Sequence, residues 1–180
     1  MKEKGKRGFV IVYTGEGKGK TTAALGMALR AVGRGWKVLM VQFMKGTWHY
    51  AELDSAQRLA PDFEIVPMGK GFYRILDDHY TEEAHREAAA AALKFAREKM
   101  ESGEYDLLIL DEINNAVSTG LLPLQAVLQF IEAKPPDFNI VLTGRGAPPE
   151  FVERADLVTE MREVKHPYQK GVFAQKGIDF

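Results

Sequence analysis

Short apolar segments, most of them nearly continuous, recur along the chain and predict the strands of a buried sheet. Strands that are apolar at almost every position, instead of alternating with polar residues, are typical of a sheet that helices cover on both faces. The predicted strands span residues 9–13, 38–43, 63–67, 106–110, 139–143 and 157–161.

Stretches with an apolar residue at every third or fourth position lie between these strands and predict helices. The clearest helix is predicted at residues 20–32, with a core-facing stripe of Ala24, Leu25, Ala28, Leu29 and Val32. Further helices are predicted at residues 51–59, 81–102, 124–133 and 149–154. Alternating strands and helices favour an α/β fold with a mostly parallel central sheet.

Residues 14–22, TGEGKGKTT, connect the first strand to the first helix and are typical of a phosphate-binding loop. Glycine at every second position lets the backbone N–H groups curl around an anion with no β-carbon in the way. We expect Lys20 to be an exposed lysine that contacts the phosphates, and Thr21 to offer its hydroxyl to Mg²⁺. The residues expected to bind nucleotide are Thr14, Gly15, Glu16, Gly17, Lys18, Gly19, Lys20, Thr21 and Thr22. Because Thr14 replaces the usual first glycine, the alternative is a flexible glycine turn before a helix.

Two acidic residues, Asp111 and Glu112, follow the predicted strand at 106–110. In proteins with a phosphate-binding loop, a carboxylate at this point reaches Mg²⁺ directly or through water, because that ion prefers oxygen ligands. Both residues are therefore candidate metal ligands together with Thr21. The alternative is a pair of ordinary surface acids, and the pattern does not distinguish a direct ligand from its helper.

Further polar residues follow other predicted strands. Arg145 lies between two glycines, where its guanidinium could contact phosphate bidentately; an arginine in a surface turn is the alternative. Because ligands bind beyond the carboxyl ends of parallel strands, we expect one site at the clusters 14–21, 45–48, 111–112 and 144–146. Among the histidines, His166 beside Lys165 is a weak candidate. The others are expected to be solvated, namely His49, His79 and His85.

Composition limits the function classes. A chain of 180 residues can bury one core, so we expect a single nucleotide-binding domain over residues 1–180 with a short basic arm at 1–8. The formal net charge of −1 does not favour a nucleic-acid partner. No apolar run approaches the roughly 18 residues that span a membrane. The chain has no cysteine, which excludes disulfides and thiolate metal sites and is compatible with the cytoplasmic location that we expect.

Several segments together resemble the P-loop type of ATP:corrinoid adenosyltransferase. Besides the loop, these are residues 41–48 (VQFMKGTW), 110–112 (LDE), 143–146 (TGRG), 164–166 (VKH) and 177–180 (GIDF). The resemblance covers nearly the whole chain and implies a three-layer P-loop NTPase (RecA-like) fold. It also implies transfer of the 5′-deoxyadenosyl group of ATP to the reduced cobalt of a corrinoid, with release of triphosphate.

The same resemblance implies residue roles. The loop would hold the triphosphate as a leaving group, and the catalytic residues would be Lys20, Thr21, Glu112 and Arg145. The further substrate-binding residues would be Phe72, Lys165 and His166, with the C-terminal tail, residues 164–180, over the site. The implied partners are a reductant or reductase for cobalt and a second copy of the chain. This sequence departs from the family pattern at Glu16, often Asn, and at Arg74, where an aromatic residue is expected.

The loop and the carboxylates alone also fit two other functions. An ATP hydrolase or phosphoryl-transfer enzyme of the same fold would release orthophosphate or ADP. A non-catalytic ATP sensor would bind ATP without turnover and pass the signal to a partner.

Overall fold

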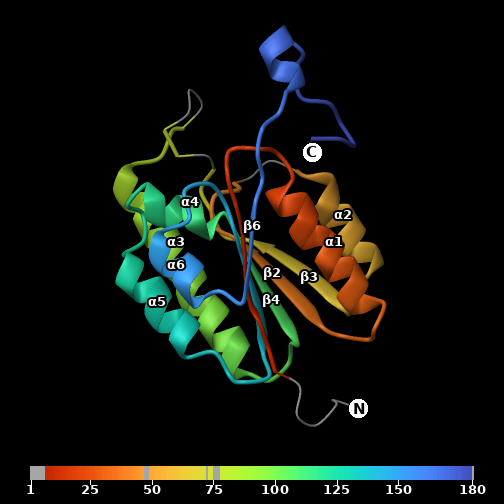
Figure 1. Ribbon diagram of the computed structural model, residues 1–180, viewed down its shortest axis with the longest axis vertical. Helices are drawn as coiled ribbons and strands as arrows, with labels where there is room; N and C mark the ends of the chain where they lie inside the picture. Colours follow the sequence, from red (N-terminus) through yellow and green to blue (C-terminus); the bar gives the residue numbers. More distant parts are fainter. Residues whose placement is uncertain (1–6, 47–48, 72, 75–77, 180) are drawn as a thin grey trace.

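The computed structural model describes residues 7–46, 49–71, 73–74 and 78–179, and places six strands in one sheet (Figure 1). The strands are β1 (Val10–Thr14), β2 (Val38–Gln42), β3 (Phe63–Pro67), β4 (Leu107–Asp111), β5 (Asn139–Thr143) and β6 (Leu157–Glu160). Neighbouring strands all pair in parallel, in the order β3-β2-β4-β5-β1-β6. The predicted α/β fold with a parallel sheet is therefore confirmed.

Helices cover both faces of this sheet (Figure 1). They are α1 (Lys20–Val32), α2 (Ala51–Arg58), α3 (Glu82–Glu101), α4 (Ile113–Ser118), α5 (Leu124–Glu132) and α6 (Pro149–Arg154), followed by a 3₁₀ turn, η1 (Pro167–Lys170). The first two helices pack on one face and the other four on the opposite face, which makes three layers. Among the described residues, none of these helices is long and apolar enough to cross a membrane.

The central strands supply two cores because successive side chains of a strand point to opposite faces. In β1, Val10 and Val12 pack toward α3 to α6, whereas Ile11 and Tyr13 pack toward α1 and α2. The pattern of nearly continuous apolar residues therefore predicted correctly that the four inner strands are buried on both faces. The edge strands differ, since only Phe63 of β3 is buried and all four residues of β6 are exposed.

Helix α1 does not bury the stripe that its sequence predicts. Leu29 is 61% exposed, and the fully or nearly buried apolar residues are Ala24, Ala28 and Ala31. Three small side chains let the helix lie close to the sheet, and this rotation turns Leu29 toward solvent. The prediction was wrong at Leu29 because spacing alone does not show which edge of an apolar stripe faces the sheet.

His85 is buried, contrary to the prediction that it is solvated. Its side chain is 3% exposed, and its Nε2 lies 2.8 Å from Oδ1 of Asp78. The rings of Tyr73 and Tyr80 contact it edge-on. The sequence could not predict this because the partners come from the irregular segment before α3, whose path depends on tertiary packing.

Candidate functional site

The carboxyl ends of the central strands bring the predicted polar clusters together. The loop after β1, the segment after β2, the acidic pair at the end of β4 and the Gly-Arg-Gly turn after β5 all lie at one edge of the sheet. Thr47 and Trp48, which belong to the second of these clusters, lie outside the described residues. For the residues described, the predicted convergence on one edge is confirmed.

Glycines are required in the phosphate-binding loop because the backbone approaches another segment closely. Gly15 and Gly19 have positive φ angles of 94° and 116°. A Cβ at Gly15 would lie 2.4 Å from the carbonyl oxygen of Met161, and the Gly17 amide donates a 2.7 Å hydrogen bond to that oxygen. The loop is therefore braced by the residues after β6, a contact that the spacing of its glycines does not indicate.

Lys20 is buried at the centre of this loop instead of exposed, which corrects the prediction. The residue is 8% exposed, and its Nζ donates to the carbonyl oxygens of Gly15 at 2.7 Å and Gly17 at 2.8 Å. Burial lowers the pKa of the Lys20 ammonium, and the nearby positive charge of Arg145 lowers it further. The loop thus folds around a desolvated cation that is stabilised by two backbone oxygens and by the charges of Glu112 and Glu16.

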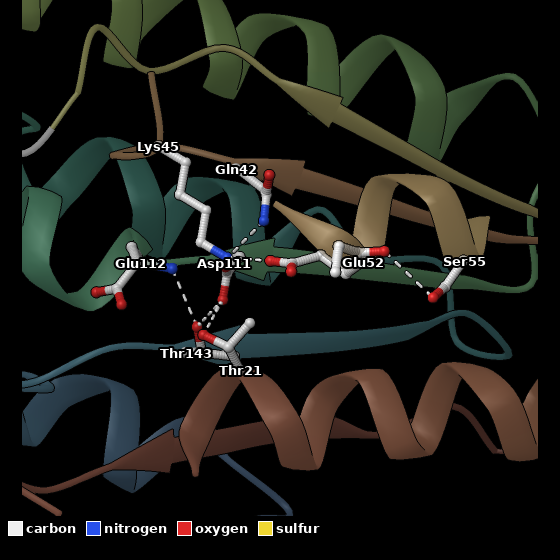
Figure 2. A network of polar contacts seen from close by, with 9 residues as sticks. Thr21, Gln42, Lys45, Glu52, Ser55, Asp111, Glu112 and Thr143 are labelled. Atoms are coloured by element: carbon white, nitrogen blue, oxygen red, sulfur yellow. Dashed lines mark hydrogen bonds and ion pairs between the residues drawn. The ribbon is translucent and has the colours of Figure 1, made fainter. Parts of the chain in front are cut away.

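Asp111, at the end of β4, joins the loop to the neighbouring strands (Figure 2). Its side chain is fully buried, and its Oδ1 accepts hydrogen bonds of 2.8 Å from the hydroxyls of both Thr21 and Thr143. Its Oδ2 accepts from Nε2 of Gln42 at 3.3 Å. Asp111 is therefore the carboxylate in contact with the threonine of the phosphate-binding loop.

Glu112 has a different environment, although it is the next residue. Its φ of 65° is left-handed, it precedes the first turn of α4, and its amide donates to the Thr143 hydroxyl at 3.0 Å. Burial, followed by repulsion from Asp111, raises the pKa of the Glu112 carboxyl to about 7. The pair thus consists of one carboxylate held in hydrogen bonds and one acid that titrates near neutrality.

We expect Glu112→Gln to stabilise the protein at pH 8. Because the folded-state pKa of about 7 lies above the ordinary value of 4.5, the folded state binds this proton more tightly, so stability falls as pH rises from 4.5 to 7. Removal of the charge should raise the free energy of unfolding by roughly 2–3 kcal/mol at pH 8 and by little at pH 4.5. Urea unfolding at both pH values, in the presence of EDTA, measures this difference.

The matched control for that measurement is Glu153→Gln, which changes an exposed glutamate on α6. It should leave stability unchanged at both pH values. If Glu112→Gln raised the free energy of unfolding equally at pH 4.5 and at pH 8, the gain would come from packing and not from ionisation. That result would contradict the raised pKa of Glu112.

Two cavities adjoin the loop. One, of about 420 Å³, is lined by Lys20, Thr21, Glu112 and residues of α2, and also by Asp179 of the tail. The other, of about 540 Å³, is lined by Glu16, Arg145 and His166 among others. Together the two cavities bring most of the predicted site residues to one region.

The C-terminal tail reaches both cavities. Asp179 pairs with Nζ of Lys18 at 2.5 Å and also lines both cavities. Salt-bridge pairing and a hydrogen bond from the amide of Gln175 hold the pKa of Asp179 below its usual value. In Figure 1 the tail leaves β6 beyond the carboxyl edge and returns toward the loop before α1.

Some predicted residues take positions that the sequence did not specify. Arg145 is more than half exposed, and its Nε lies 3.4 Å from a carboxylate oxygen of Glu16. The ring of His166 accepts a hydrogen bond from the amide of Tyr168. Lys165 is exposed. Phe72 lies outside the described residues, so its place near a substrate stays a prediction.

Sequence reasoning missed two buried polar residues of the site, Gln42 and Thr143, and gave no role to Lys45 of the predicted cluster at 45–48. Thr143 bridges Asp111 and Glu112 from the neighbouring strand, and Lys45 lies at the wall of the smaller cavity. Gln42 is fully buried at the end of β2. A polar residue that closes an apolar strand was the available signal for both Gln42 and Thr143, because such a residue is rarely buried without a partner.

Comparisons of the sequence with known proteins point to one family. The sequence pattern of the family described as ATP:corrinoid adenosyltransferase BtuR/CobO/CobP matches residues 6–180. The corrinoid adenosyltransferase of Escherichia coli K12 is 39% identical over 175 residues, which are 97% of this chain and 87% of that protein. The corrinoid adenosyltransferase of Pseudomonas aeruginosa is 41% identical over 97% of this chain and 85% of that protein.

Solved structures with low sequence identity share the fold. The flagellar accessory protein FlaH from Methanocaldococcus jannaschii superposes with a TM-score of 0.59 at 15% identity, over 86% of this chain and 71% of FlaH. The RadB recombinase gives a TM-score of 0.53 at 15% identity, over 90% of this chain and 78% of RadB. These likenesses, together with the parallel sheet between two layers of helices, confirm the predicted fold class.

Proposed function

The chain belongs to the family of ATP:corrinoid adenosyltransferases, and we propose that its phosphate-binding loop holds the triphosphate of ATP as the leaving group. The enzyme transfers the adenosyl group of ATP to the cobalt of a corrinoid. The observation that carries the proposed role of the loop is the buried Lys20 beside Thr21 at the wall of one cavity, with the Thr21 hydroxyl donating to the buried Asp111.

The bond changes define what the protein must supply. The reduced cobalt of the corrinoid donates an electron pair to C5′ of the ribose, and the bond between C5′ and the triphosphate oxygen breaks with its electron pair on that oxygen. No proton moves in this step, so no general base is needed. The chain's task is to align the cobalt, C5′ and leaving oxygen, to neutralise the triphosphate and to keep water away.

Lys20 and the loop amides are suited to the charge on the leaving group. A desolvated ammonium interacts more strongly with phosphate oxygens than a solvated one, because little water competes. The positive end of α1, which begins at Lys20, adds to this field. Arg145 lines the larger cavity and offsets the carboxylate of Glu16, the residue at which this chain departs from the family pattern.

The residues around Thr21 fit a Mg²⁺ ion. A threonine hydroxyl and a buried carboxylate are hard oxygen donors, as this ion prefers. The described residues contain no group of three or more acidic or histidine side chains that could hold a metal by themselves, which agrees with an ion that is bound largely by phosphate and water. Thr21 and Asp111 would hold it, with Glu112 beside them. When bound, Mg²⁺ neutralises charge on the triphosphate.

The larger cavity and the tail are assigned to the rest of the substrates. His166 and Asp179 line it from residues 164–180, which supports the expectation that the tail covers the site. Lys165 and Phe72 are assigned to substrate binding on the family resemblance. These residues would help to align the corrinoid with ATP.

An anaerobic assay tests the role of the loop. We expect Mg²⁺, ATP and chemically reduced cob(I)alamin to give a light-sensitive alkylcobalt product and one equivalent of inorganic triphosphate. The corrinoid spectrum follows the first product, and ion chromatography identifies the second. If orthophosphate or ADP accumulates in place of triphosphate, the loop acts on the terminal phosphate and the proposal fails.

The partners beyond the substrates complete the proposal. Because the reacting cobalt is in its reduced state, a reductant or reductase is the proposed source of its electrons. A homodimer is proposed on the exposed edge strand β6, where Leu157 and Val158 are 45% and 39% exposed. The proposed location is the cytoplasm, as expected from the sequence.

A further inference from the structure

Lys45 is a buried lysine in the wall of the cavity that contains Lys20. It follows β2, its side chain is 10% exposed, and it lines the cavity together with Lys20 and Thr21. Lysines are rarely buried unless a charged partner compensates for the loss of hydration. The charged partners of Lys45 should therefore explain how its burial is compensated.

Lys45 contacts one carboxylate from each of two elements (Figure 2). It forms an ion pair with Glu52, in the first turn of α2, and its Nζ lies 3.8 Å from Oδ2 of Asp111. The Nζ also lies 4.5 Å from the centre of the Tyr50 ring. The ammonium is thus fixed between α2 and β4.

Lys45 and Thr21 approach Asp111 from opposite sides of β4. In the sheet β4 lies between β2 on one side and β5, followed by β1, on the other. Thr21 reaches Asp111 from the β1 side, whereas Lys45 reaches it from the β2 side (Figure 2). Lys20 and Lys45 therefore come from loops on either side of the acidic strand end and line the same cavity.

We propose that Lys45 is a second cation for the polyphosphate chain of the substrate, in addition to Lys20. This inference rests on the proposed function, because it adds a contact to the same triphosphate. A triphosphate carries more negative charge than one lysine neutralises, and the smaller cavity offers a buried ammonium at a second wall. An ammonium has three donors, so Lys45 can retain Glu52 while donating to a phosphate oxygen.

The experiment measures the binding of the polyphosphate and of the nucleoside separately. Calorimetric titrations measure the affinity of the full chain for inorganic triphosphate and, separately, for adenosine, both in the presence of Mg²⁺. We expect Lys45→Met to weaken triphosphate binding by about tenfold to a hundredfold, the loss typical of a hydrogen bond to a charged group, and to leave adenosine binding unchanged. Lys45→Arg, which keeps the positive charge, should recover most of the affinity.

The matched control is Lys99→Met. Lys99 also pairs with a glutamate, Glu104 at 3.3 Å, and its Nζ also lies near a tyrosine ring, that of Tyr105, but it is in the last turn of α3. Its substitution removes the same kinds of contact away from the cavity and should leave both affinities unchanged.

Three outcomes would overturn the proposal. Unchanged triphosphate affinity in Lys45→Met would show that Lys45 only balances Asp111. Equal losses for triphosphate and adenosine would show a structural role. If Lys45→Met does not fold, NMR of the unmodified protein provides the test, with the ¹⁵Nζ resonance of Lys45 assigned by its absence in Lys45→Arg. This resonance should shift when inorganic triphosphate is added, and an unchanged resonance would overturn the proposal. Failure of the unmodified protein to bind triphosphate would instead contradict the proposed function.

Discussion

Replacement of Lys20 by alanine is expected to reduce adenosyl transfer by about a hundredfold to a thousandfold, the usual cost of removing one charge-stabilising donor from a reaction site. The ammonium of Lys20 is the buried cation at the centre of the loop, where it donates to the carbonyl oxygens of Gly15 and Gly17. Triphosphate leaves as an anion, so the loss should appear in the transfer step as well as in ATP binding. Single-turnover transfer under anaerobic conditions measures it.

The same variant should remain folded. The carbonyl oxygens of Gly15 and Gly17 lose their donor, but the cost of burying a cation disappears at the same time, so we expect stability to change by less than about 2 kcal/mol. A thermal melt checks this. Loss of the folded state would show that Lys20 is mainly a structural residue.

Lys134→Ala is the control for Lys20→Ala. The Nζ of Lys134 donates to three backbone carbonyl oxygens, those of Gly8, Pro135 and Phe138, and burial lowers its pKa as it does for Lys20. It lies at the amino end of the strands, away from the loop. Its substitution should affect stability by a similar amount and leave the transfer rate unchanged.

Asp111→Asn is expected to lower the transfer rate by at least about a hundredfold at low Mg²⁺ concentration, and excess Mg²⁺ should restore part of it. Asp111 is the carboxylate that shares Oδ1 between the hydroxyls of Thr21 and Thr143, so its charge acts next to the loop. Glu112→Gln should reduce the rate by less, about tenfold, because Glu112 lies at the cavity wall with a raised pKa.

The dependence of the rate on Mg²⁺ distinguishes the two acids. For Asp111→Asn the Mg²⁺ concentration at half-maximal rate should rise, whereas Asp106→Asn, just before β4 at the other edge of the sheet, should leave it unchanged. A larger shift for Glu112→Gln than for Asp111→Asn would reverse the proposed roles and make Glu112 the direct ligand.

Local patterns predicted the elements and the position of the loop. Glycine spacing in residues 14–22 and the apolar run before Asp111 depend on neighbours in sequence, so they are visible without the fold. Strand and helix bounds followed for the same reason, mostly to within one or two residues. The exception is α4, which was not predicted: it begins two residues after the end of β4, and its sequence INNAVS contains two asparagines.

The sequence could not predict contacts that join distant elements. Lys45 meets Asp111 only because β2 and β4 are neighbours in the sheet. Lys20 was predicted to be exposed because it is a charged loop residue, but the folded loop around it buries its side chain. The assignments of Arg145, His166 and the other site residues to substrates stay predictions.

The place of β1 in the sheet also affects how the protein is made. β1 is synthesised first, but it pairs with β5 and β6, which follow residue 138. At about 5–20 residues per second, a ribosome needs on the order of ten seconds to produce those partners. During that time the apolar strand before the phosphate-binding loop has no sheet to join, and such long-range parallel pairing forms slowly. We therefore expect the nucleotide site to be completed late in synthesis, after β5 and β6 have paired with β1 and Met161 has reached the loop.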